Sequence, residues 1–146
     1  MSQKSTFAGG CSCGAVRYEF TVAREELMMF KCHCRDCQRV SGGPYAPVVY
    51  IPATAGRLTV VRGQVKHHFT PSEMAGQHKR GFCADCGSPI YSQREKVPEM
   101  MVLKVGTLDD PRDLKLVMNI WTNSARTWMH LDPAIEHHPE NRPVKA

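Results

Sequence analysis

Three clusters of closely spaced cysteines constrain this chain more than any other feature of its sequence. They read Cys11-x-Cys13, Cys32-x-Cys34-x-x-Cys37 and Cys83-x-x-Cys86, and they contain all seven cysteines of the 146 residues. An odd number of thiols cannot all pair as disulfides, and these spacings are typical of metal ligands. Structural zinc sites usually take four protein ligands, whereas catalytic sites keep three. Seven cysteines therefore divide most simply into one closed zinc site and one open site.

The chain has the length and composition of one ordinary globular domain. Hydrophobic residues make up 42% of it and charged residues 23%, which is typical of a protein with a packed core. We expect a single zinc-binding domain over residues 1–146, with about residues 5–135 as its ordered core. The tail from His137 to Ala146 has two prolines and no apolar pattern, so we expect it to be loosely ordered.

Charge and hydropathy limit the classes of partner. Nineteen Lys and Arg against fourteen Asp and Glu give a formal net charge of +5. These charges are spread along the chain, which indicates an anionic ligand only weakly and makes nucleic acid a poor candidate. The N-terminus has no apolar signal region, and the most apolar stretch, residues 46–53, is too short to span a membrane. Together with the clustered thiols, this predicts a cytoplasmic protein.

Alternation of apolar and polar residues dominates over helical periodicity, which predicts a mainly β domain of short antiparallel strands. One or two short helices are expected, at residues 36–40 and 123–129. The third and fourth expected strands are predicted to form a hairpin around Gly63. The expected strands are residues 16–20, 45–51, 58–61, 66–70, 78–82, 100–105 and 116–120.

The first and third clusters have the geometry of a structural metal site. Residues i and i+2 of an extended strand project from the same face, about 6.6 Å apart along the chain, so Cys11 and Cys13 can converge on one ion. Cys83 and Cys86 bracket a tight turn, and Gly87 can adopt the positive φ that lets backbone amides face sulfur. If one zinc ion joins the two pairs, it ties the first strand to the middle of the fold and contributes directly to folding.

The central cluster, Cys32, Cys34 and Cys37, differs because no fourth cysteine remains for it. Three thiolates within six residues can cap one face of a metal ion, with the last sulfur in the first turn of a short helix. A histidine is one alternative fourth ligand, and the candidates are His33, His67, His68 and His78. Another alternative pairs Cys34 and Cys37 with Cys83 and Cys86 as a zinc ribbon, which leaves three thiols unused.

An open site with three thiolates favours thiol chemistry over hydrolysis. Zinc with three thiolates has a net charge near −1, which makes it a poor source of activated hydroxide and a better partner for a soft ligand. An incoming thiol, deprotonated by coordination, is the expected fourth ligand. Nucleobase deaminases also use three-cysteine zinc, but their His-x-Glu and Pro-Cys-x-x-Cys elements are absent from this sequence.

The cysteine motifs and their neighbours resemble one known family. The segments Gly10–Tyr18, Cys32–Arg39 with Ser41-Gly42, and Phe82–Tyr91 are similar to the glutathione-dependent formaldehyde-activating enzyme family, which includes centromere protein V. Residues 105–111 and the Thr127-Trp128 region also match the family pattern. The resemblance covers nearly the whole chain, and three cysteine motifs in order make it specific.

The resemblance implies a fold, two zinc sites and a reaction. The implied fold is the β-tent, mainly antiparallel and shared with methionine sulfoxide reductase B. The implied closed zinc site is Cys11, Cys13, Cys83 and Cys86, and the implied catalytic zinc site is Cys32, Cys34 and Cys37. The namesake enzyme is a carbon–sulfur lyase that joins glutathione to formaldehyde. The expected cofactor is therefore zinc, one ion structural and one catalytic and labile, and the expected partners are a small thiol and an aldehyde.

Cationic residues next to the cysteine motifs are the candidate ligand-binding groups. Arg35, Arg39 and Lys79 are predicted to bind the carboxylates of a thiol such as glutathione, on the basis of their proximity in sequence. Two other functions are compatible with the same sequence. One is a non-catalytic zinc module that binds a macromolecule, and the other is a thiol-redox protein of the same fold.

Overall fold

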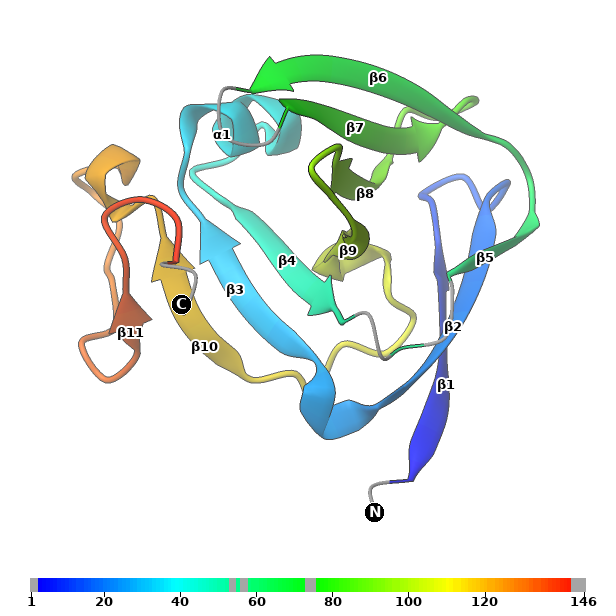
Figure 1. Ribbon diagram of the computed structural model, residues 1–146, viewed down its shortest axis with the longest axis horizontal. Helices are drawn as coiled ribbons and strands as arrows, with labels where there is room; N and C mark the ends of the chain where they lie inside the picture. Colours follow the sequence, from blue (N-terminus) through cyan, green and yellow to red (C-terminus); the bar gives the residue numbers. More distant parts are fainter. Residues whose placement is uncertain (1–2, 53–54, 56–57, 73–75, 143–146) are drawn as a thin grey trace.

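In the computed structural model of this protein, residues 3–52, 55, 58–72 and 76–142 are described, and they form two β-sheets with one short α-helix (Figure 1). The smaller sheet has the strand order β1-β2-β5, and the larger has the order β11-β10-β3-β4-β9-β8-β7-β6. Most neighbouring strands are antiparallel, whereas β10 runs parallel to β3 and β11. The prediction of a mainly β domain of short strands is confirmed. The elements are β1 (Lys4–Gly10), β2 (Arg17–Ala23), β3 (Met28–Cys32), α1 (Arg35–Ser41), β4 (Ala46–Ile51), β5 (Thr59–Arg62), β6 (Val65–Ser72), β7 (Gly76–Cys83), β8 (Pro89–Arg94), β9 (Val97–Lys104), β10 (Leu116–Ile120) and β11 (Glu136–His137), with 3₁₀ turns at Arg24–Glu26, Val105–Thr107 and Thr122–Ser124.

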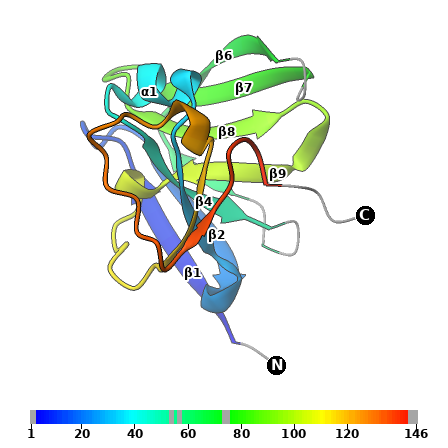
Figure 2. The same ribbon diagram turned by 90° about the vertical axis from the view of Figure 1, so that its left-hand side faces the viewer.

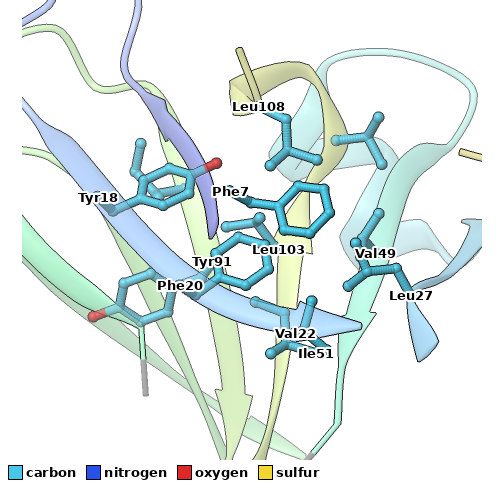
Figure 3. Close-up of a cluster of buried hydrophobic side chains, with 12 residues drawn as sticks. Phe7, Tyr18, Phe20, Val22, Leu27, Val49, Ile51, Tyr91, Leu103 and Leu108 are labelled. Carbon is cyan, nitrogen blue, oxygen red and sulfur yellow. The ribbon is translucent and has the colours of Figure 1, made fainter. Parts of the chain in front are cut away.

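The hydrophobic core lies between the two sheets (Figure 3). Phe7, Phe20 and Val22 come from the small sheet, and the rings of Phe7 and Phe20 stack with centroids 5.4 Å apart. Val49 and Leu103 come from facing positions of β4 and β9 in the large sheet. Successive side chains of a strand point to opposite faces, so the residues next to these core residues lie on the other face of the large sheet.

The predicted hairpin of residues 58–61 and 66–70 is wrong. β5 pairs with β2 in the small sheet, and β6 pairs with β7 in the large sheet. Gly63, which separates them, has φ of 83°, and a Cβ atom there would lie 2.2 Å from the carbonyl oxygen of Ala15. This close approach to the turn before β2 keeps the end of β5 beside β2 in the small sheet. The chain then crosses to the large sheet, where β6 begins.

The helix predicted at residues 36–40 is confirmed as α1. The Sγ atom of Cys34, the N-cap residue, accepts a hydrogen bond from the backbone N–H of Cys37, and Gly42 ends the helix in the left-handed conformation with φ of 73°. A side-chain acceptor at the N-cap and a left-handed glycine after the last turn commonly mark the two ends of a helix, although here the acceptor is a sulfur.

The helix predicted at residues 123–129 is wrong, and the start of this stretch instead bonds to the C-terminal segment. The N–H of Thr122 donates to the carbonyl of His138, and that of Asn123 donates to Pro139. Only the 3₁₀ turn Thr122–Ser124 forms there. In Figure 1 the orange-to-red C-terminal segment runs along the outer side of β10, and Figure 2 shows it from that side. The predicted loose tail is therefore held by hydrogen bonds as far as Asn141, and residues 143–146 lie outside the described residues.

Candidate metal centres and the surface beside them

The first and third cysteine motifs meet at one place. Cys11 and Cys13 lie in the turn after β1, Cys83 ends β7 and Cys86 lies in the turn before β8, and their four Sγ atoms are all within 4.8 Å of one another. The Sγ atoms of Cys11 and Cys13 are 3.5 Å apart, and those of Cys13 and Cys83 are 3.9 Å apart. Tetrahedral zinc with Zn–S bonds of about 2.3 Å separates its sulfurs by about 3.8 Å. The four-cysteine cluster therefore has the dimensions of a zinc site.

Backbone amides surround the sulfurs of the four-cysteine cluster. The N–H of Val16 donates to Cys11 Sγ at 3.2 Å, and the N–H groups of Asp85 and Cys86 donate to Cys83 Sγ at 3.4 Å. Gly87 has φ of 78°, so the positive φ expected after this motif is found. Amide donors favour the charged form of a thiol, and the loops are thus shaped for thiolate ligands.

The central motif forms a separate three-cysteine cluster. Cys32 ends β3, Cys34 is the N-cap of α1 and Cys37 lies in its first turn, and their Sγ atoms are all within 4.8 Å of one another. Within the described part of the chain, no histidine nitrogen and no fourth cysteine joins this group. Neither the histidine alternative nor the zinc-ribbon alternative matches this arrangement. The two clusters could hold metal ions, one with four sulfur ligands and the other with three.

The three central thiols share negative charge unequally. Hydrogen bonds from Cys32 and then Cys37 lower the pKa of Cys34 to about 2. The hydrogen bond with Cys34 has the opposite effect on Cys32 and raises its pKa, as does burial. The cluster thus concentrates anionic sulfur at the N-terminus of α1, which is a favourable place for negative charge and suits a bound cation.

Two cations and a histidine face this cluster from the large sheet. Lys104 is close enough to interact electrostatically with Cys37, Cys32 and Cys34. Burial lowers the pKa of Lys104, and the charge of Cys37 opposes that decrease. The nearby positive charge of Arg80 also lowers the pKa of Lys104. Burial likewise lowers the pKa of His78. Sequence proximity missed Lys104 because 67 positions separate it from Cys37.

A shallow pocket of about 210 Å³ lies beside the three-cysteine cluster. Val40 of α1 forms one wall, and His68, Arg80 and Lys104 are among the residues of the opposite wall. The cysteine side chains do not line the pocket themselves, but α1 and Lys104 connect it to them. A small molecule with an anionic group fits the charge of this surface.

The structure places the three predicted ligand-binding residues differently from one another. Arg35 is exposed on α1 and donates a hydrogen bond to the side-chain oxygen of Gln38. Arg39 is exposed on the same helix. Lys79 pairs with Phe69 and Gln93 and lines a different pocket of about 330 Å³ with them. The sheet register puts Lys79 on the core-facing side of β7 and Arg80 on the side of the three-cysteine cluster.

None of the helices in the described residues is both long and apolar enough to cross a membrane.

Comparison with known proteins agrees with this arrangement. The chain is similar to a solved crystal structure of a Rhodobacter sphaeroides protein, with a TM-score of 0.56 and 28% sequence identity over 73% of this chain and 93% of that one. The family model of the glutathione-dependent formaldehyde-activating enzyme matches residues 6–124. This match spans most of the chain and includes all seven cysteines of the two clusters. The chain therefore belongs to the glutathione-dependent formaldehyde-activating enzyme family.

Proposed function

We propose that this protein is a zinc-dependent enzyme of the carbon–sulfur lyase type. It binds a small anionic thiol of the glutathione class at the three-cysteine cluster and adds it to an aldehyde such as formaldehyde. The observation that carries the proposal is a cluster of three sulfurs, without a fourth protein ligand among the described residues, beside a cationic pocket. Family membership supports the same reaction.

Each group has a distinct part in the proposed reaction. A zinc ion held by Cys32, Cys34 and Cys37 would supply a positive centre that keeps an incoming thiol deprotonated at neutral pH. Arg80 and Lys104 attract the carboxylates of that thiol and orient it in the pocket. The thiol sulfur then forms a bond to the aldehyde carbon, the carbonyl π bond breaks, and the thiol proton ends on the new hydroxyl oxygen.

The four-cysteine cluster has a structural part in this proposal. A zinc ion on Cys11, Cys13, Cys83 and Cys86 would have a complete set of protein ligands, which leaves no position for substrate. It would join the turn after β1 to the turn between β7 and β8. Because thiolate ligands must remain reduced, a reducing compartment such as the cytoplasm suits both clusters.

Cobalt substitution tests the proposal directly. The Co²⁺-loaded protein is titrated with glutathione, and the thiolate-to-metal charge-transfer band is followed. A new sulfur ligand should shift and strengthen this band, and formaldehyde consumption should follow the same thiol dependence. In a Cys37→Ser variant the thiol-dependent change should disappear. An unchanged spectrum with every thiol tried would contradict the proposal, and a single metal ion per chain with three reactive thiols would favour a redox protein instead.

A further inference from the structure

The buried polar side chains in the described residues gather at one place. They are His33, Gln38 and Asn119, with 0%, 6% and 1% of their surface exposed. His33 lies between two cysteines of the three-cysteine cluster, Gln38 follows the third, and Asn119 is on β10. Burying a polar group has a free-energy cost unless it is hydrogen-bonded. The hydrogen bonds that these three side chains make therefore restrain the backbone next to the three-cysteine cluster.

Hydrogen bonds join the loop of the three-cysteine cluster to the end of β10. The backbone N–H of His33 donates to the carbonyl of Ile120 at 3.0 Å. His33 Nε2 lies 2.9 Å from Asn119 Oδ1. The side-chain amide of Gln38 donates both to the carbonyl of His33 at 2.7 Å and to that of Ser124 at 3.0 Å. The backbone on both sides of Cys34 is therefore held by residues 119–124.

The hydrogen bonds that join His137, Asn119 and His33 have one consistent assignment of donors and acceptors. His137 Nε2 lies 2.9 Å from the carbonyl oxygen of Asp132, which can only accept, so this nitrogen carries the proton. In the neutral ring, His137 Nδ1 is then an acceptor for the side-chain amide of Asn119, 3.3 Å away. Asn119 Oδ1 in turn accepts from His33 Nε2. Every donor in this chain of bonds faces an acceptor, which fixes the orientation of Asn119.

The C-terminal segment also forms hydrogen bonds with residues 119–122 on the side away from the three-cysteine cluster. The N–H of His138 donates to the carbonyl of Asn119 at 2.9 Å, and the N–H of Trp121 donates to Glu140 at 3.0 Å. The indole N–H of Trp121 also donates to Asn141 at 2.8 Å. Trp121 is in the left-handed conformation with φ of 58°, which costs a non-glycine residue about 1–2 kcal/mol. The C-terminal segment compensates that cost with these bonds.

We propose that Asn119 is a positioning residue for the three-cysteine cluster, and that the C-terminal segment 132–141 forms part of the metal site's outer support. This segment lies beyond the residues that the family model matches, which end at 124. The inference rests on the proposed metal binding at Cys32, Cys34 and Cys37. Groups behind metal ligands typically change metal affinity by 10–100-fold when they are removed. Asn119 acts through His33, whose backbone joins two of the three ligands.

Metal release from the two clusters tests the inference. The metal-loaded protein is mixed with an excess of a chelating indicator, and the two release phases are assigned with Cys37→Ser, which lacks the central one. Asn119→Leu should accelerate release from the three-cysteine cluster 10–100-fold and change release from the four-cysteine cluster less than about twofold. His137→Ala alters an exposed residue and should accelerate the same phase by a smaller factor, about threefold.

Tyr18→Phe is the matched control, because it also removes a buried hydrogen bond. The hydroxyl of Tyr18 lies 2.7 Å from Thr107 Oγ1, and this bond is separate from those of His33, Gln38 and Asn119. This variant should unfold at lower denaturant concentration without selective loss of the central metal ion. Equal acceleration of both phases by Asn119→Leu, or a central phase within twofold of wild type, would overturn the inference. If Asn119→Leu does not fold, His137→Ala decides in the same way. A wild-type protein without a second metal ion would overturn the proposed function as well.

Discussion

At the scale of single residues, two neighbouring cations have different surroundings. Lys79 and Arg80 are adjacent in sequence, yet Lys79 lies beside Phe69 on the core-facing side of β7, whereas Arg80 lines the pocket beside the three-cysteine cluster. Alternation along a strand predicts that the two point to opposite faces. It does not predict which face meets the cluster, because that depends on how β7 pairs with β8 and how β9 pairs with β4.

The two cations therefore offer a matched pair of charge reversals. Arg80→Glu should weaken glutathione binding roughly tenfold or more, equivalent to about 1.4 kcal/mol, because a carboxylate would face the carboxylates of the ligand. Lys79→Glu makes the same change of charge on the opposite face of the sheet and should alter the dissociation constant less than about twofold, since salt screens charges that lie farther from the ligand. Thiol titration of the Co²⁺ protein measures both.

A cationic thiol provides the reverse check. Cysteamine carries an ammonium group, so Arg80→Glu should strengthen its binding at low salt while it weakens the binding of glutathione. Equal effects of the two substitutions on either thiol would contradict the assignment of the pocket to Arg80.

At the scale of elements, the first strand approaches the 3₁₀ turn Val105–Thr107 very closely. Gly9 of β1 forms a bridge with Leu108, and a Cβ atom at Gly9 would lie 2.2 Å from the carbonyl oxygen of Thr107 and 2.3 Å from the hydroxyl of Tyr18. A backbone carbonyl cannot move away as a flexible side chain can. The contact between the small sheet and the end of β9 therefore requires glycine at this position.

Gly9→Ala should lower the free energy of unfolding by about 1–3 kcal/mol, the usual cost of overpacking. Gly106→Ala is the control, because Gly106 lies in the same 3₁₀ turn but a Cβ atom there has no neighbour within 4 Å. Urea unfolding measures both variants. An unchanged midpoint for Gly9→Ala would show that β1 does not lie against this turn.

Several elements could not be predicted from sequence periodicity. The helix after Cys34 was predictable because its cap, cysteine spacing and terminal glycine are local signals. β3 was missed because its residues Met28–Cys32 are partly buried on both faces and do not alternate. The partner of β5 and the contact of Asn119 with His33 depend on residues far apart, the latter by 86 positions. Local sequence carries no signal for such pairs.

At the scale of the whole molecule, the four-cysteine cluster joins the two sheets. Cys11 and Cys13 follow β1 of the small sheet, and Cys83 and Cys86 lie between β7 and β8 of the large one. Structural zinc contributes about 10–16 kcal/mol to the folding of small domains, as much as the total stability of most domains. A metal ion at this cluster would therefore govern whether the two sheets remain packed.

Replacing one cysteine of each cluster should separate their contributions. Cys83→Ser should lose one metal ion and most of the folded population together, because it removes a buried ligand of the site between the sheets. Cys37→Ser should also lose one metal ion but retain the folded β-sheet signal, since its cluster lies within one sheet and its helix. Metal content and circular dichroism of the two variants provide the measurements. A Cys83→Ser protein with wild-type stability would show that this cluster does not support the fold.

The position of the outer support along the chain has a consequence for biosynthesis. The ribosome completes the three-cysteine cluster at residue 37 and the four-cysteine cluster at residue 86, but it adds His137 only afterwards. At 5–20 residues per second, the 51 residues between positions 86 and 137 take roughly 3–10 s to synthesise. During that interval a nascent chain has all its sulfur ligands but lacks residues 132–141, and for the first 33 residues of the interval it also lacks Asn119. Metal captured early would thus enter a loosely held central cluster, and residues 132–141, which are made later, would tighten it.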